Sequence, residues 1–280
     1  MLLSRLHRIK LIYKKNGFKG IINHILYKLK INFRLSDDII KKKYFFSKFV
    51  SEEYGYKIQS GHFKGVYLKN SLNIEILSNK LENLYETEVI NEIIELQSKF
   101  KKKYFINLGV SDGFYVNGLL AKNIFPFSIC YDLDKKSISA CEKNLIHNKI
   151  SADRYSLINE KIDYSSFQYF DNNKIDLEDC LFLIDIEGDE IDFLSLKILE
   201  KLKNSILIVE MHEFLKNKDF SILKDNLENF FQVKKISIEN RNLELKDIHK
   251  KILRSEIEKH IYISEQRPSF MHWYVCIPKN

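Results

Sequence analysis

The apolar positions of this chain follow two rhythms. From residue 104 onward, short uninterrupted apolar segments alternate with stretches in which apolar residues recur every three or four positions. Uninterrupted apolar segments are typical of parallel strands buried on both faces, and the longer spacing is that of one helix face. The strands that we expect are Tyr104–Val110, Ser128–Asp132, Arg154–Asn159, Cys180–Ile186 and Ser205–Met211. This alternation predicts an α/β fold built on a parallel sheet.

The end of the chain adds a different pattern to this sheet. Helices are expected in the gaps, near residues 114–123, 135–148 and 189–203. Gln232–Ile238 and Met271–Ile277 then look like two further strands, with a helical segment at about 242–260 between them. We expect these strands to close the sheet as an antiparallel hairpin. The predicted fold class is therefore α/β, with a mostly parallel seven-stranded sheet, helices on both faces and an antiparallel last strand.

Before residue 101 the pattern is helical and basic. Two apolar stripes at helical spacing occupy residues 2–13 and 18–29, with Asn16-Gly17 as a helix end between them. Residues 56–76 alternate and contain glycines, which suggests a small strand pair, and residues 81–99 have the spacing of an amphipathic helix. We expect three parts: a basic amphipathic helical extension at 1–55, the strand pair and lead-in helix at 56–100, and the main domain at 101–280.

Positive charge is concentrated in the extension. Residues 1–50 contain 13 Lys and Arg residues and two acids, a net charge of +11, whereas residues 51–280 have a net charge of −4. A basic amphipathic helix can lie on an anionic membrane. It can equally pack its apolar stripe on the main domain and leave its lysines in solvent, as most surface helices do. Nucleic acid is not favoured as a partner, because no recognised nucleic-acid-binding module accompanies the charge.

Composition excludes several classes of protein. With 45% hydrophobic residues and only 9 Gly and 3 Pro among 280 residues, the chain is not disordered, collagen-like or of low complexity. Its longest uninterrupted apolar run, Cys180–Ile184, has five residues, against about 20 for a membrane-spanning helix. The four cysteines lack the spacing of a zinc site or a disulfide framework, and the charged N-terminus is unlike a signal peptide. These features indicate the cytoplasm, with the inner face of the membrane as the alternative location.

A glycine turn follows the first expected strand. The segment Asn107-Leu-Gly109-Val-Ser111-Asp-Gly113 stands where ligands bind in doubly wound sheets, at the carboxyl end of a strand. Glycine lets the backbone approach a ligand closely, but the third glycine of a dinucleotide fingerprint is misplaced here. The next strand ends in Asp132, 19 residues after Gly113, where an acid can bind both hydroxyls of a ribose. Together these features indicate an adenosyl or nucleotide ligand.

Several segments, in order along the chain, resemble one known family. Ile106–Tyr115 looks like motif I of class I S-adenosylmethionine-dependent methyltransferases, particularly the FkbM-like group. Phe182–Glu190 is similar to the Asp-x-Glu-Gly-x-Glu signature of that group's fourth strand. Further matching segments are Tyr131–Asp134, Ile206–Glu213 and Glu265–Trp273. The resemblance covers residues 81–280 and implies a Rossmann-like methyltransferase fold with S-adenosylmethionine as cofactor.

The resemblance also implies roles for single residues. The residues expected to line the methionine part of the cofactor are Gly109, Ser111 and Gly113. By the same resemblance, Asp132 would bind the ribose and Asp163 would contact the adenine amine. Motif I usually opens with an acid and here opens with Asn107. An asparagine can still hydrogen-bond the amino group of the ligand, but without the strength of a charge-assisted bond.

Polar residues also follow the fourth and fifth expected strands. Asp185 and Glu187 stand at the end of one strand and His212 at the end of the other, so we expect the three to meet at the ligand-binding edge. Methyl transfer to a hydroxyl needs the acceptor oxygen held close and its proton removed, and His212 or Asp185 could be the base. A carboxylate pair with a histidine could also hold a divalent metal, but the spacing is not diagnostic and a metal is not favoured. Glu190 and Glu213 are interpreted as charges at helix N-termini.

These features predict an S-adenosylmethionine-dependent methyltransferase. The expected reaction is O-methylation of a hydroxyl on a sugar, a surface-glycan intermediate or another small molecule. Tyr85-Glu86, which resembles a pair before motif I in related sequences, adds a weaker ligand candidate. Two alternatives stay open. One is a non-catalytic membrane-associated binding protein that keeps the fold, motivated by Asn107, and the other is a metal-dependent hydrolase that uses Asp185, Glu187 and His212.

Overall fold

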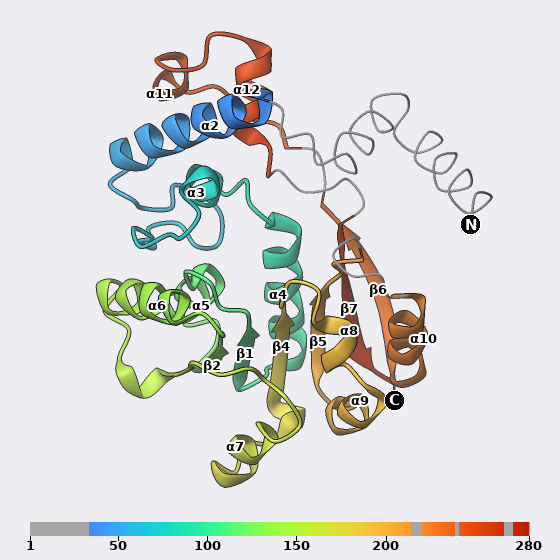
Figure 1. Ribbon diagram of the computed structural model, residues 1–280. Helices are drawn as coiled ribbons and strands as arrows, with labels where there is room; N and C mark the ends of the chain where they lie inside the picture. Colours follow the sequence, from blue (N-terminus) through green and yellow to red (C-terminus); the bar gives the residue numbers. More distant parts are fainter. Residues whose placement is uncertain (1–33, 214–219, 239–240, 266–270, 280) are drawn as a thin grey trace, which may run out of the picture. The chain divides into compact units, whose positions relative to one another are not determined.

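The computed structural model describes residues 34–213, 220–238, 241–265 and 271–279. Both apolar stripes expected before residue 30 lie outside these residues. The chain divides into two compact units, residues 1–42 and 43–280, and the strands of the sheet belong to the second (Figure 1). Among the described residues, no helix is both long enough and apolar enough to cross a bilayer.

Seven strands form one sheet, in the order β3-β2-β1-β4-β5-β7-β6. Every pairing within β3-β2-β1-β4-β5 is parallel, and β7 runs antiparallel to both β5 and β6. The expected seven-stranded sheet with an antiparallel last strand is thereby confirmed. The strands are β1 Tyr104–Leu108, β2 Phe127–Tyr131, β3 Tyr155–Ile158, β4 Cys180–Ile184, β5 Ile206–Glu210, β6 Phe231–Ser237 and β7 His272–Pro278.

Helices cover both faces of the sheet, as the sequence predicted. Along β4, Leu181 and Leu183 pack in one apolar cluster, whereas Cys180, Phe182 and Ile184 pack in the other. The first cluster includes residues of α3 Ile74–Leu81, α4 Thr87–Phe100, α5 Phe114–Ala121 and α6 Lys135–His147. The second includes residues of α7 Phe167–Asn172, α8 Glu190–Phe193, α9 Leu196–Leu202 and α10 Phe220–Phe230. Short 3-10 turns at Ala152–Arg154 and Leu177–Asp179 precede β3 and β4.

Three expected elements differ in detail. The helix expected at 81–99 is interrupted at 82–86, where Asn83 and Glu86 take a left-handed backbone conformation that a helix cannot contain. The helix expected at 189–203 is divided into α8 and α9. The expected strand pair at 56–76 is reduced to one antiparallel bridge between Lys57 and Tyr67. The interruption at 82–86 includes Glu86, which lines the cavity described below.

A third apolar cluster lies outside the two faces of the sheet. It joins α2, Arg34–Glu53, to the segment between β6 and β7, which contains α11 Asp247–Lys250 and α12 Glu256–Ile263. Phe46 and Val50 of α2 pack there with Tyr262 and Ile263. Glu82 is buried beside this cluster and accepts hydrogen bonds from Tyr54 Oη at 2.9 Å, from His249 Nε2 at 2.7 Å and from Tyr262 Oη. One carboxylate therefore ties together three segments that are far apart in sequence.

Glu82→Gln is expected to lower the free energy of unfolding by about 2–4 kcal/mol at pH 7, because charge-assisted bonds to a buried carboxylate become neutral or are lost. Burial by itself raises the pKa of Glu82, but the bonds from His249 and Tyr262 outweigh it and the pKa is lowered. A lowered carboxyl pKa adds stability above the ordinary value of about 4.3, and this is lost as the pH falls through the folded-state pKa. Urea denaturation across this pH range measures the effect.

The matched control is Glu244→Gln, because Glu244 is an exposed glutamate in the segment between β6 and β7. It is expected to change stability by less than about 0.5 kcal/mol. Equal losses in the two variants, or a difference that persists unchanged into acid, would contradict the role given to Glu82.

Candidate functional site

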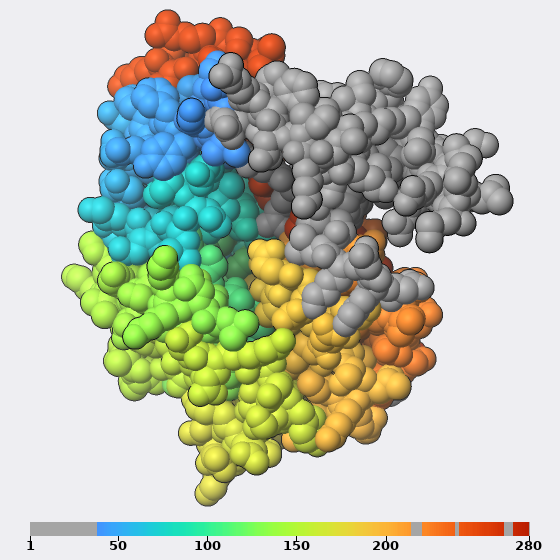
Figure 2. All heavy atoms as spheres, in the orientation of Figure 1, coloured from blue at the N-terminus to red at the C-terminus, as the bar shows by residue number. Residues whose placement is uncertain are grey.

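A cavity of about 680 Å³ opens at the carboxyl ends of β1, β2 and β4. In doubly wound sheets ligands bind at the point where the strand order reverses, which here is between β1 and β4. Figure 2 shows the face on which the cyan, green and gold segments that line this cavity meet. These lining segments lie within 73–86, 107–115, 131–137, 160–164 and 183–198.

The glycine turn after β1 forms the floor between two neighbouring strands. Gly109 has φ +82°, and a Cβ built on it would lie 1.7 Å from the carbonyl oxygen of Asp185. Its N–H donates to the carbonyl of Tyr131 at 2.9 Å, and the N–H of Asp185 donates to the carbonyl of Leu108 at 3.0 Å. Only glycine fits where the chain passes this close to the end of β4. The turn therefore holds the backbone of β1, β2 and β4 together at the cavity.

Asp132, at the end of β2, is fixed by that turn. Its Oδ2 accepts the N–H of Ser111 at 2.9 Å, and its Oδ1 accepts the N–H of Asp134 at 2.8 Å. Ser111 itself has φ +50°, a conformation uncommon for a residue other than glycine. Each carboxylate oxygen retains a further lone pair. Asp132 is thus positioned at the cavity wall with capacity to accept hydrogen bonds from a ligand.

The remaining residues expected to bind a cofactor are placed differently from one another. Asn107 is 2% exposed and lines the cavity, and its Oδ1 has no hydrogen-bond partner among the described residues. Asp163 lies in an exposed loop at the cavity edge, and hydrogen bonds from Ser165 and Ser166 lower its pKa. Gly113 begins α5 and is not among the lining residues. A Cβ on it would meet Cys141 Sγ at 2.5 Å, so its glycine is explained by helix packing.

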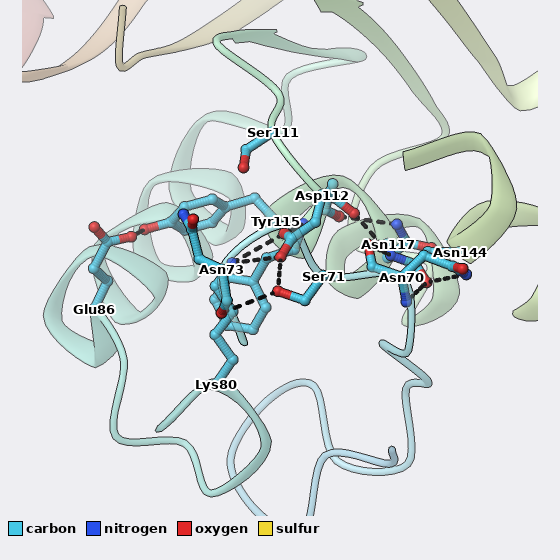
Figure 3. A network of polar contacts seen from close by, with 12 residues as sticks. Asn70, Ser71, Asn73, Lys80, Glu86, Ser111, Asp112, Tyr115, Asn117 and Asn144 are labelled. Carbon is cyan, nitrogen blue, oxygen red and sulfur yellow. Dashed lines mark hydrogen bonds and ion pairs between the residues drawn. The ribbon is translucent and has the colours of Figure 1, made fainter. Parts of the chain in front are cut away.

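A buried ion pair between Lys80 and Asp112, which the sequence did not indicate, stabilises the glycine turn after β1. Lys80 Nζ lies 2.8 and 3.0 Å from the two carboxylate oxygens of Asp112, and Ser71 Oγ donates to Oδ2 at 2.7 Å (Figure 3). Asn144 of α6 donates to the carbonyl oxygen of Asp112 at 2.9 Å. Lys80 also lies 5.2 Å from the ring centroid of Tyr85. The segment before β1 therefore fixes the loop that shapes the cavity.

Glu86 belongs to the same wall. It is 1% exposed, has φ +46° and accepts a hydrogen bond from Tyr115 Oη, as Figure 3 shows. Burial raises the pKa of Tyr115 well above its ordinary value, so the phenol stays a donor. A buried carboxylate in a left-handed conformation beside a cavity is an arrangement that functional sites favour. The Tyr85-Glu86 pair was the signal in the sequence that pointed to it.

The structure brings the polar residues after β4 and β5 together around one imidazole. His212 is 2% exposed, and its Nδ1 lies 2.9 Å from Glu190 Oε1. Its Nε2 faces Glu210 Oε2 at 3.5 Å, Glu187 Oε2 at 3.6 Å and Asp185 Oδ1 at 3.7 Å. Asp185 and Glu187 line the cavity, whereas His212 lies behind them and is not a lining residue.

Crowding of these carboxylates changes their proton affinities. Burial raises the pKa of Asp185 to about 6, against the opposing charge of His212. Burial and the neighbouring Asp185 carboxylate raise the pKa of Glu210 well above its ordinary value. Burial lowers the pKa of His212, but its bond to Glu190 and the charge of Asp185 outweigh this and the pKa is raised. The pKa of Asp185 therefore lies in the range where general acid–base chemistry operates.

Glu190 has a role that the sequence did not suggest. It begins α8, as expected, but its side chain is fully buried and does not serve only as a charge at the helix N-terminus. Its Oε1 accepts the N–H groups of Ile186 at 3.0 Å and Gly188 at 3.2 Å, in addition to its contact with His212. Glu190 stands at the start of α8, and His212 follows β5, 22 residues later in sequence, which is why local spacing could not reveal the pair.

Comparisons with known proteins give structural neighbours only. No family model and no curated protein matches the chain. The methyltransferase domain of bacterial CtHen1-C is 15% identical with a TM-score of 0.44, and the match covers 71% of this chain and 100% of that one. The O-methyltransferase TomG of Streptomyces achromogenes, solved with SAM, is 8% identical with a TM-score of 0.44, covering 68% and 78% respectively.

A third neighbour is TrmK of M. capricolum, solved with S-adenosylhomocysteine. It is 15% identical with a TM-score of 0.42, and the match covers 69% of this chain and 68% of that one. Likeness at this level is no basis for assigning a substrate or a residue's role. The fold class rests on the sheet topology itself, and the function must be argued from the site.

Proposed function

We propose that this protein is an S-adenosylmethionine-dependent methyltransferase that methylates a hydroxyl group of a sugar, a surface-glycan intermediate or another small molecule. The observation that carries the proposal is the close approach of the Gly109 backbone to the backbone of Asp185, with Asp132 held nearby by the N–H of Ser111. At Gly109 a ligand can contact the backbone directly, because there is no side chain. Asp132 is an acid that could accept the ribose hydroxyls on the wall of the same cavity. The order of the FkbM-like motifs along the chain supports the finer assignment.

The residues present fit the proposed cofactor. Asn107 presents a buried Oδ1 without a partner among the described residues, which can accept a hydrogen bond from the amino group of the methionine part. Asp132 can accept bonds from the ribose hydroxyls. Among the described residues, ten acids and two lysines line the cavity, and Lys80 and Lys161 are each paired with an acid, at 2.8 and 2.9 Å. This predominance of acids among the described lining residues favours a positively charged ligand.

When bound, S-adenosylmethionine would supply an electrophilic methyl group on a sulfonium. The chain's own contribution is to orient the acceptor and to take its proton. Asp185 lies at the cavity wall, and its pKa of about 6 suits a group that accepts a proton near neutral pH. His212 and Glu210 lie directly behind it, so a proton that arrives at Asp185 is stabilised within a shared network.

The acceptor is proposed from chemistry and from the charge of the extension. A net charge of +11 on residues 1–50 fits an acceptor that is held at an anionic membrane surface. A glycan intermediate on a lipid carrier would combine such a location with free hydroxyl groups. The membrane contact and the sugar acceptor are parts of the same proposal and rest on the sequence.

Transfer of a tritiated methyl group to a panel of sugars, sugar nucleotides and lipid-linked glycans tests this function. We expect one acceptor class to gain label, to gain the mass of one methyl group, and to lose the label when S-adenosylhomocysteine is added. The labelled position should be an oxygen, stable to conditions that hydrolyse methyl esters. Tight cofactor binding without transfer to any hydroxyl would favour the non-catalytic alternative, and labelled nitrogen or carbon would overturn O-methylation.

A further inference from the structure

Four carboxylates surround one buried imidazole where β4 and β5 end. We propose that His212 Nε2, Asp185 and Glu210 form a binding site for one divalent metal ion, that Glu187 completes it from the solvent side, and that Glu190 positions the histidine. The three oxygens that face Nε2 lie 3.5, 3.6 and 3.7 Å from it. They belong to three different side chains.

The three oxygens lie slightly farther from Nε2 than two ligands of the same ion lie from each other. Two atoms bound to the same ion at about 2.1 Å lie roughly 3.0–3.4 Å apart in tetrahedral or octahedral geometry. The observed separations exceed this by a few tenths of an ångström, and all are longer than a good hydrogen bond. A small inward movement of the carboxylates would therefore complete the site. Asp185, Glu190 and His212 also each offer a ligand atom within 4.8 Å of the others.

Two buried oxygens in the group have no hydrogen-bond partner among the described residues. They are Asp185 Oδ1, the atom that faces His212 Nε2, and Glu190 Oε2 on a side chain that is 0% exposed. A buried carboxylate oxygen without a partner is costly unless something compensates its charge. A divalent cation beside Asp185 would compensate the charge of the oxygens in this group.

Glu190 makes His212 suitable as a ligand. Histidines that bind metals usually donate their other ring N–H to a carboxylate, which fixes the ring and the tautomer. Glu190 Oε1 stands 2.9 Å from Nδ1 and is itself held by the N–H groups of Ile186 and Gly188. The Nδ1–H is thus directed at Glu190, and the lone pair of Nε2 is directed at the other carboxylates. One imidazole with carboxylate oxygens suits manganese or zinc better than calcium.

The ion would stand at the wall of the cavity, because Asp185 and Glu187 are lining residues. With the ion bound, Asp185 would hold it instead of acting as the base, and the ion could bind an oxygen of the acceptor and lower the pKa of its hydroxyl. This role in the reaction rests on the proposed function, whereas binding of the ion does not. A sugar with two adjacent hydroxyls is an acceptor that such an ion could hold at both oxygens.

Titration of the chelator-treated full chain with Mn²⁺, followed by the electron paramagnetic resonance of free Mn²⁺, tests the site without any methyl donor. We expect one ion per chain, with affinity at least tenfold weaker in Asp185→Asn and in Glu210→Gln. Both changes replace a carboxyl group that would bind the ion by an amide of nearly the same shape, so folding is expected to survive. The control Glu160→Gln removes one charge from the wall of the same cavity, away from the imidazole, and should stay within twofold of wild type.

Three results would overturn the site: no Mn²⁺ binding by the wild type, equal affinity in Asp185→Asn and wild type, or an equal loss in Glu160→Gln. The methyl donor is titrated separately in the presence of a chelator. Donor binding without Mn²⁺ binding would support the proposed function and rule out the metal site. Mn²⁺ binding without donor binding would support the metal site and contradict the proposed function.

Discussion

Gly109→Ala is expected to abolish cofactor binding and to lower the free energy of unfolding by at least about 3 kcal/mol. The added Cβ would lie 1.7 Å from the carbonyl oxygen of Asp185, which belongs to the backbone and cannot rotate away. Either β4 must move away from β1 or the turn must leave its left-handed conformation. Either movement changes the backbone of the turn against which the cofactor would bind. Calorimetric titration and thermal denaturation measure the two effects.

Gly65→Ala is the matched control for this substitution. Gly65 has φ +87°, close to the +82° of Gly109, but a Cβ there meets nothing within 4 Å. It therefore carries the same backbone strain, about 1–2 kcal/mol, without the collision. Cofactor affinity should be unchanged in this variant. If the two variants lose stability and affinity alike, the close crossing of β1 and β4 is not what requires glycine.

Asp132→Asn is expected to weaken binding of S-adenosylmethionine by about 30-fold or more. The carboxylate accepts the N–H of Ser111 and is proposed to accept both ribose hydroxyls. An amide of the same shape makes these bonds neutral and turns one acceptor into a donor. Losing about 1 kcal/mol on each of two charge-assisted bonds corresponds to a factor of about 30. Titration calorimetry of the variant, which should remain folded, gives this ratio.

Asp176→Asn is the matched control, because it makes the same substitution in a similar turn that does not line the cavity. Asp176 accepts the N–H of Glu178 at 2.9 Å, in the same two-residue turn that Asp132 forms with Asp134 at 2.8 Å. This variant is expected to bind the cofactor as the wild type does. A loss of cofactor affinity in Asp132→Asn alone shows that the carboxylate acts on the ligand and not only on the conformation of its turn. Unchanged affinity in Asp132→Asn would remove Asp132 from the cofactor site.

The sheet was predictable because its strands are buried on both faces. A strand such as Cys180–Ile184 must be apolar at every position, and that leaves a segment that local inspection finds. The glycine turn and Asp132 were predictable for a related reason, since strand ends in such sheets meet at one edge. The interruption before α4 could not be predicted in this way. The helical spacing of apolar residues continues through 82–86, whereas the structure breaks the helix there and buries Glu82 and Glu86.

The partners of the site residues could not be predicted from local pattern. Lys80 and Asp112 are 32 residues apart, and Glu190 and His212 are 22 residues apart. Which charges meet across such distances is decided by the packing of whole elements. The sequence placed Asp185, Glu187 and His212 at one edge, but the fold alone shows that His212 lies behind the two acids, away from the cavity surface.

Titration calorimetry of the wild-type chain with S-adenosylmethionine, and with NAD as the comparison ligand, shows whether the cavity binds a methyl donor. We expect one site for S-adenosylmethionine with micromolar affinity, about −8 kcal/mol, and no heat from NAD. S-adenosylhomocysteine should bind the same site. A well-folded sample that binds neither S-adenosyl compound would contradict the assignment of the cavity as a methyl-donor site.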